Sequence, residues 1–171
     1  MLYYSIENAS VEDLSLIYEL FEQAIAFQKA NHYIGWQDYD KGFIQSDVEN
    51  KLLYKIRKGK DIIGIFCICL SDVLIWREKE QGDAIYLHRI VLNQQFKGTK
   101  IFQQVFDWTV NYAKAKGLAY IRMDTWATNS KIIAYYKSYG FRFVEEYITP
   151  GTDALPVQHR NLKVALLEYT V

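Results

Sequence analysis

Residues 86–102 read Tyr86-Leu87-His88-Arg89-Ile90-Val91-Leu92-Asn93-Gln94-Gln95-Phe96-Lys97-Gly98-Thr99-Lys100-Ile101-Phe102. The segment begins as an apolar run typical of a buried strand, continues as a short polar loop and passes into helical spacing around Gly98. Free backbone N–H groups and the dipole at a helix N-terminus favour an anion, and Lys97 and Lys100 add positive charge. The pattern therefore predicts a strand, an anion-binding loop and a helix. An ordinary strand-to-helix turn with two solvated lysines is the alternative.

Hydrophobic periodicity predicts the other elements, and their order indicates the fold class. Predicted strands cover 3–7, 52–57, 62–70, 84–92, 118–124, 141–148 and 161–169, and predicted helices cover 10–29, 40–48, 98–116 and 129–139. Ser10, Asp40 and Asn129 are the expected helix caps. The early strands form hairpins and the later ones alternate with helices, which predicts an α/β protein with a mixed sheet and helices on both faces. Without a repeat or linker, residues 1–171 are expected to form one domain.

Composition excludes several kinds of partner. Lys and Arg together number 20, as do Asp and Glu, so the formal net charge is zero and supplies no bulk field for nucleic acid or an acidic membrane. No apolar run approaches the roughly 20 residues that span a bilayer. The first residues lack the layout of a signal peptide. We therefore expect a cytoplasmic protein with no nucleic-acid and no membrane partner.

Cys67 and Cys69 both lie in the predicted strand 62–70. Alternate residues share one face of a strand, so we expect both thiols in the same packing layer. Their spacing supplies no further ligands. The prediction is two buried, reduced, structural thiols and no metal site.

A second informative segment is Ile121-Arg122-Met123-Asp124-Thr125-Trp126-Ala127-Thr128-Asn129, which leads into 132–141. In it, Asn129, Tyr136 and Gly140-Phe141 match the signature that GNAT acetyltransferases carry after their fifth strand. Together with 86–102, the segment resembles that family. The resemblance covers nearly the whole chain as element order and is specific over about 86–143.

The resemblance implies a GNAT acyltransferase fold, a single mixed, mostly antiparallel twisted sheet of six to seven strands with helices on both faces and a splay between strands four and five. It also implies acetyl-CoA as the donor, no metal, and direct transfer to a primary amine of a small molecule. The family pairs the pantetheine arm with fourth-strand backbone, which here is Ile90, Val91 and Leu92. Its pyrophosphate loop maps onto Lys97, Gly98, Thr99, Lys100, Ile101 and Phe102, with Gln95–Lys100 as the competing register. Both registers lack family glycines.

The resemblance also assigns catalytic roles. Tyr136 falls on the position of the acid that protonates the departing thiolate, and Asn129 and Tyr136 are expected to contact the donor. His88 matches a catalytic histidine of some members, as base or relay, and burial is expected to lower its pKa below about 6.5. A core hydrogen bond is the alternative for His88. Weaker base candidates are Glu78, Glu80 and Asp124, the last interpreted as a cap or turn carboxylate.

Three loops, 31–40, 72–83 and 149–160, are expected to form the acceptor pocket. Tyr33, Trp36 and Trp126 are its candidate aromatic walls, or else pack in the core. Two rival functions remain open at this point. One is a catalytically inactive CoA-binding module on the same fold, and the other is an interaction protein whose aromatic surface drives self-association, for example as a homodimer.

Overall fold

The computed structural model describes residues 4–171 and contains a seven-stranded mixed sheet in the order β1-β2-β3-β4-β5-β7-β6. Four neighbouring pairs, β1–β2, β2–β3, β5–β7 and β6–β7, are antiparallel, whereas β4 and β5 are parallel. This confirms the predicted fold class. The strands are β1 (Tyr4–Asn8), β2 (Leu53–Lys58), β3 (Asp61–Cys69), β4 (Ala84–Leu92), β5 (Tyr120–Trp126), β6 (Arg142–Ile148) and β7 (Lys163–Thr170). The helices are α1 (Leu14–Ala30), α2 (Lys41–Glu49), α3 (Val73–Trp76), α4 (Ile101–Lys116) and α5 (Ser130–Lys137).

The chain divides into two compact units, and β3, β4 and α4 each contribute residues to both. The first unit comprises 1–68 and 89–108, and the second comprises 69–88 and 109–171. The predicted first strand began at Tyr3, which lies outside the described residues. A single domain stays a prediction.

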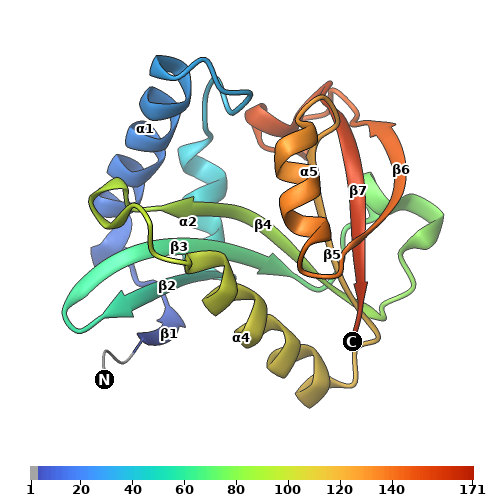
Figure 1. Ribbon diagram of the computed structural model, residues 1–171, viewed down its shortest axis with the longest axis horizontal. Coiled ribbons are helices and arrows are strands. Elements are labelled where there is room, and N and C mark those ends of the chain that lie inside the picture. The colour runs from blue at the N-terminus through green and yellow to red at the C-terminus, as the bar shows by residue number, and fades with distance from the viewer. Residues whose placement is uncertain (1–3) are drawn as a thin grey trace. The chain divides into compact units, whose positions relative to one another are not determined.

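In the first unit, helices cover both faces of the strands (Figure 1). Ile65 and Cys67 of β3 belong to a buried cluster with Phe21 of α1 and Ile44 of α2. The intervening Phe66 points the other way, and its ring centroid lies 5.3 Å from that of Trp108 in α4. The alternation of side chains along a strand therefore places α1 and α2 on one face and α4 on the other.

Side-chain carboxylates accept hydrogen bonds at two helix starts, close to the positions where the sequence predicts caps. The Asp13 carboxylate accepts hydrogen bonds from the backbone N–H and the hydroxyl of Ser10, at 2.8 and 3.1 Å, ahead of α1. Asp40 accepts from the backbone N–H groups of Gly42 and Phe43 at the start of α2. Each cap satisfies amides that a helix leaves without an internal partner.

Gly64 of β3 lies where α4 packs closely on the sheet. A Cβ added there would lie 2.0 Å from Cδ1 of Ile101 and 2.9 Å from the carbonyl oxygen of Val91. We expect Gly64→Ala to lower the free energy of unfolding by about 1–3 kcal/mol through overpacking. Urea denaturation measures this loss. Ile101→Val removes the clashing methyl group, so Gly64→Ala should cost less in that background, and fully additive losses would contradict the packing explanation.

The second unit has a separate core beneath β4, β5 and β7. Trp76, Tyr86 and Leu166 are among its buried members. Near them, buried Arg122 pairs with Glu168 at 2.7 Å and donates to the Tyr86 hydroxyl at 3.1 Å. A buried ion pair with its hydrogen bonds satisfied thus anchors β5 against β7.

The connection 72–83, which the sequence left unassigned, forms α3 and a 3-10 turn over Arg77–Lys79.

The predicted equivalence of the two cysteines is wrong. Cys67 is fully buried in the core of the first unit, where burial raises the pKa of its thiol to about 12. Cys69 is only partly buried and packs against the core of the second unit. Alternate strand residues share a face, but the boundary between the two units falls between Cys67 and Cys69. Each thiol therefore packs against a different core.

No helix within 4–171 is both long and apolar enough to cross a lipid bilayer.

Candidate functional site

The parallel pairing of β4 with β5 stops within the second unit. It runs from Ala84 opposite Tyr120 to Leu87 opposite Met123. His88 and Asp124 are the next residues along their strands, so their side chains emerge where the backbones cease to pair. This is the separation of strands four and five that the sequence predicts.

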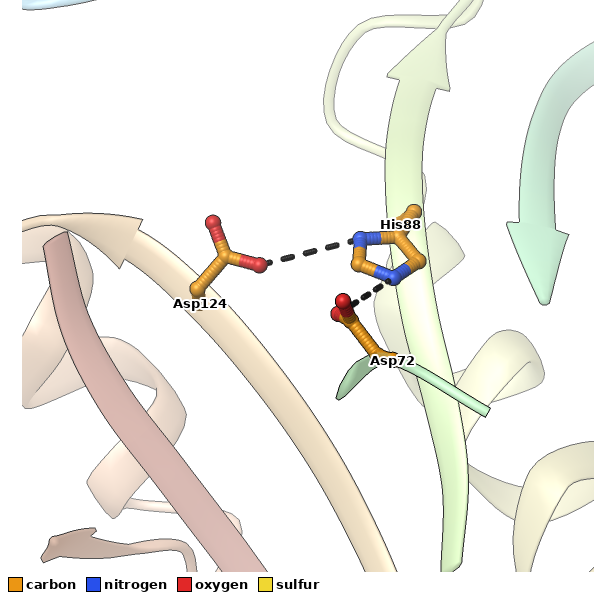
Figure 2. Close-up of side chains that lie close together, drawn as sticks. All are labelled: Asp72, His88 and Asp124. Atoms are coloured by element: carbon orange, nitrogen blue, oxygen red, sulfur yellow. Dashed lines mark ion pairs between the residues drawn. The ribbon is translucent and has the colours of Figure 1, made fainter. Parts of the chain in front are cut away.

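A third side chain joins them from another segment (Figure 2). Asp72 precedes α3 and brings its Oδ2 atom to 3.3 Å from Nε2 of His88, while Oδ1 of Asp124 lies 3.7 Å from Nδ1 of the same ring. All three side chains are about nine-tenths buried, with exposed fractions of 10% for His88 and 9% for each carboxylate. One imidazole is therefore flanked by a carboxylate at each nitrogen. We call these three residues the Asp–His–Asp cluster.

The cluster changes the protonation expected for His88. Burial by itself lowers the pKa of this imidazole, but interactions with Cys69 and with the Asp72 carboxylate outweigh it and raise the pKa well above 6.5. The expectation of a pKa below 6.5 is wrong, because burial removes the ring from water but also places it beside acidic partners. His88 is thus mainly an imidazolium at neutral pH.

Asp124 is the residue that sequence reasoning placed incorrectly. The predicted strand ended on Asp124, which suggested a cap or turn carboxylate, whereas β5 runs on to Trp126 and places Asp124 within the strand, 3.7 Å from His88. The other base candidates have structural partners. Glu80 accepts from the backbone N–H groups of Asp72 and Gly82. Glu78 is exposed and pairs with Lys79 at 3.1 Å.

Tyr136 lies on α5 and is partly buried. Burial, followed by the charges of Tyr135 and Asp124, raises the pKa of its hydroxyl above the ordinary value of 10. The phenol keeps its proton at neutral pH, so the hydroxyl is present as a donor, although the raised pKa makes it a weaker acid than an ordinary tyrosine. The side-chain oxygen of Asn129 accepts from the backbone N–H of Ile132 at 3.1 Å, so Asn129 caps α5 as the sequence predicts.

The predicted pyrophosphate loop belongs to the first unit. The helix begins at Ile101, three residues after the predicted start at Gly98. Gly98 has a left-handed backbone with φ of +91°, and no atom lies within 4 Å of the position of a Cβ. Lys97 and Lys100 are exposed on either side of it. Open space, a helix N-terminus and two lysines are chemically suited to a pyrophosphate.

Residues of the loop also form hydrogen bonds with one another. The N–H groups of Thr99 and Ile101 donate to the carbonyl oxygens of Phe96 and Thr99, at 3.2 and 2.8 Å. The Thr99 hydroxyl donates to the Phe96 carbonyl at 2.8 Å. A phosphate oxygen could accept from these amides only by displacing the internal hydrogen bonds. This barrier and the shortage of glycines in the loop both oppose close approach of a phosphate to the backbone.

Strand β4 carries an unusual backbone just before the predicted pantetheine contacts. Arg89 has φ of +50°, a left-handed conformation that is uncommon for a residue other than glycine. Its guanidinium forms a largely buried ion pair with Asp47 of α2. The ion pair holds Arg89 in place, and β4 continues past it through Ile90, Val91 and Leu92.

The three predicted aromatic walls have different surroundings. Tyr33 is 57% exposed and meets Phe27 edge-on, with ring centroids 5.8 Å apart. Trp36 packs against the core of the first unit, with its ring centroid 5.4 Å from that of Phe21. Trp126 is partly buried at the end of β5 in the second unit. The structure thus favours core packing for Trp36.

The fold matches solved acetyltransferases over nearly the entire chain. The crystal structure of a GNAT-family acetyltransferase from Listeria monocytogenes 4b F2365 aligns with a TM-score of 0.81 at 18% identity, covering 99% of this chain and 96% of that one. The structure of yncA, a putative acetyltransferase from Salmonella typhimurium with its cofactor acetyl-CoA, aligns with a TM-score of 0.66 at 13% identity, covering 98% and 94%. Such low identities show the fold alone.

Sequence comparison is more specific. Residues 14–141 match the model of the Acetyltransferase (GNAT) family, and the chain belongs to that family. The uncharacterized N-acetyltransferase MJ1207 of Methanocaldococcus jannaschii is 23% identical over 145 residues, which are 81% of this chain and 60% of that protein. The chain thus spans only part of the length of this relative.

Proposed function

We propose that this protein transfers the acetyl group of acetyl-CoA to a primary amine of a small molecule by direct attack in a ternary complex. Membership of the GNAT family supports acetyl transfer. The observation that carries the proposal is the Asp–His–Asp cluster, which places a titratable ring where β4 and β5 cease to pair. Acetyl-CoA supplies the acetyl group as a reactive thioester.

Donor binding is assigned to the residues that match the family's motifs. Lys97–Phe102 would hold the pyrophosphate through charge and amides, and the backbone of Ile90–Leu92 would pair with the pantetheine arm, as a peptide adds to a sheet edge. Asn129 would contribute through its side-chain N–H groups, since its oxygen already caps α5.

Two proton transfers then require two groups with opposite tasks. An amine attacks only after losing its proton, and His88 in its neutral form would accept that proton at one ring nitrogen. Tyr136 would donate its hydroxyl proton to the departing thiolate. Because its neighbours keep His88 protonated, the fraction of enzyme that can accept a proton grows as pH rises above neutrality.

Acetyl-CoA should raise the melting temperature of the protein. A ligand at 100 times its Kd stabilises the native state by about 2.7 kcal/mol. Replacing Lys97 and Lys100 together with alanine should reduce the shift in differential scanning fluorimetry. A matched variant at Lys114 and Lys116, exposed in the last turn of α4, should leave it unchanged. Absence of any shift at millimolar acetyl-CoA would overturn the donor assignment.

A module that keeps the fold but has lost catalysis is the second candidate, because internal hydrogen bonds occupy two amides of the loop and would weaken its hold on the donor. It predicts a thermal shift with acetyl-CoA but no release of thiol with any amine. The proposed enzyme gives both. Cytoplasmic location, the absence of a metal requirement and homodimer formation stay predictions from the sequence.

A further inference from the structure

We propose that Glu80 is a positioning residue for His88, because its carboxylate fixes the backbone of Asp72 and thereby the contact between Asp72 and the imidazole. This role rests on the proposed function, in which the same imidazole is the base. Glu80 acts through Asp72 and takes no proton itself. All three residues belong to the second unit.

Asp72 does not perform the usual task of an acidic residue at its place in the fold. It occupies the N-cap position of α3, where an aspartate usually accepts a hydrogen bond from the backbone N–H two or three residues later. Its side chain makes no such bond. The Oδ2 atom lies 3.3 Å from Nε2 of His88 instead (Figure 2). Since the carboxylate does not hold the start of α3, another group is needed to fix the backbone of Asp72.

Glu80 supplies that contact from the segment after α3. Its Oε2 atom accepts the backbone N–H of Asp72 at 2.8 Å, and its Oε1 atom accepts that of Gly82 at 2.7 Å. Burial raises the pKa of the Glu80 carboxyl, but hydrogen bonds from the Tyr86 hydroxyl and from these two N–H groups outweigh it and lower the pKa below 4.5. Glu80 is therefore ionised at neutral pH, and hydrogen bonds to a charged acceptor are the stronger kind.

A buried network on the sheet holds Glu80 in turn. The Tyr86 hydroxyl, which forms a hydrogen bond with Glu80, accepts from Nη1 of Arg122 at 3.1 Å. The same Nη1 atom donates to the carbonyl oxygen of Lys79, the residue before Glu80, at 2.8 Å. Nε of Arg122 pairs with Glu168 at 2.7 Å. Side chains of β4, β5 and β7 thus place Glu80 and attach the connection 72–83 to the sheet.

Other groups also act on the His88 ring, so Asp72 makes one contribution to its pKa. Burial lowers that pKa, and the interactions that raise it come from Cys69 on β3 and from Asp72. Oδ1 of Asp124 on β5 lies 3.7 Å from Nδ1, and the ring of His159 lies 6.2 Å away, centroid to centroid. Substitution of Glu80 leaves those other three side chains in place. A change in the pKa of His88 therefore reports its contact with Asp72.

Glu80→Gln keeps the shape of the side chain but puts an amide NH2 in place of one oxygen, so it cannot accept from Asp72 and Gly82 at once. We expect the pKa of His88 to fall by about one unit, because a nearby opposite charge shifts a pKa by about 1–3 units and the contact with Asp72 loosens. Titration of the imidazole resonances by heteronuclear NMR measures this pKa without ligand, and the spectrum of His88→Gln assigns the signal. The acidic limb of the pH–rate profile should move to lower pH by the same amount.

Asp72→Asn distinguishes positioning from a direct effect of the Glu80 charge. It removes the carboxylate that contacts the ring, so it should lower the pKa of His88 further than Glu80→Gln does. In the Asp72→Asn background, Glu80→Gln should cause little additional change, because two residues that act through one contact are not additive. An equal fall in both backgrounds would mean that Glu80 acts by charge through space, and would overturn the proposal.

Two further variants control for charge and for folding. Tyr86→Phe removes the hydroxyl that forms a hydrogen bond with Glu80 and alters no formal charge, so it should lower the pKa of His88 in the same direction. Glu78→Gln removes an exposed carboxylate that pairs with Lys79, two residues before Glu80, and should leave the pKa of His88 unchanged. If Glu80→Gln does not fold, Tyr86→Phe decides the question. An unchanged pKa in folded Glu80→Gln or in Tyr86→Phe contradicts the positioning role.

The NMR titration needs neither acetyl-CoA nor turnover, so it separates this role from the proposed function. A lowered pKa of His88 in Glu80→Gln, with no thiol release from any amine in the unmodified protein, would support positioning and overturn the proposed function. Acetyl transfer by the unmodified protein, with an unchanged pKa in Glu80→Gln, would overturn positioning and leave the proposed function intact.

Discussion

Tyr136→Phe is expected to lower kcat by about 10²–10⁴-fold, the range typical of a general acid, while the affinity for acetyl-CoA changes little. The substitution removes one hydroxyl and keeps the ring. Ring packing against Phe141, with centroids 6.3 Å apart, should therefore survive. Steady-state kinetics on a true acceptor and calorimetric titration with acetyl-CoA measure the two effects separately.

Tyr135→Phe provides the control for Tyr136→Phe. Tyr135 is the preceding residue on α5, is 42% exposed, and its hydroxyl lies 3.4 Å from that of Tyr139. Removing this hydroxyl should change kcat by less than about tenfold. Unchanged turnover in Tyr136→Phe would exclude the acid role once a pre-steady-state burst has shown that product release does not limit the rate.

His88→Gln is expected to reduce kcat/KM by a similar factor of about 10²–10⁴ and to remove the acidic limb of the pH–rate profile. An amide can keep a hydrogen bond in the cluster but cannot accept the proton of an amine. In the unmodified enzyme that limb should lie above pH 6.5, because the neighbours of His88 raise its pKa. A limb below pH 6.5, or full activity in His88→Gln, would contradict the base role.

The same raised pKa has a consequence for stability. A group whose folded pKa exceeds its unfolded value stabilises the fold fully below the unfolded pKa, about 6.5 for histidine, and that contribution is lost as pH rises through the folded pKa. Unfolding free energies should therefore decline with pH above 6.5 in the unmodified protein. His88→Gln should flatten this decline. The role of His88 as a base is thus measured by the pH–rate profile, and its role as a stabilising cation by the pH dependence of unfolding.

Local chemistry in the sequence was sufficient to predict most of the elements. Strand β4 was predicted at its observed bounds, 84–92, because a continuous apolar run ends at a polar loop. The caps at Asp40 and Asn129 were predicted because a cap acts within three residues of itself. Ser10 lies at the predicted N-cap position, but its hydroxyl and N–H donate to Asp13. The start of β5 was placed two residues early, since Leu118 and Ala119 are as compatible with a strand as the residues that follow.

The sequence by itself determined the family, the order of strands and helices, and the placement of Tyr136 on a helix and of His88 on a strand, because hydrophobic periodicity and short motifs are local properties of the chain. Only the tertiary structure decided the surroundings of His88. Asp72 and Asp124 come from separate segments, and no spacing rule indicates that their carboxylates flank one ring. Whether the pKa of a buried imidazole falls or rises depends on the balance between lost hydration and adjacent negative charge. That balance is set by distances of a few ångströms between residues far apart in the chain, and the fold alone determines them.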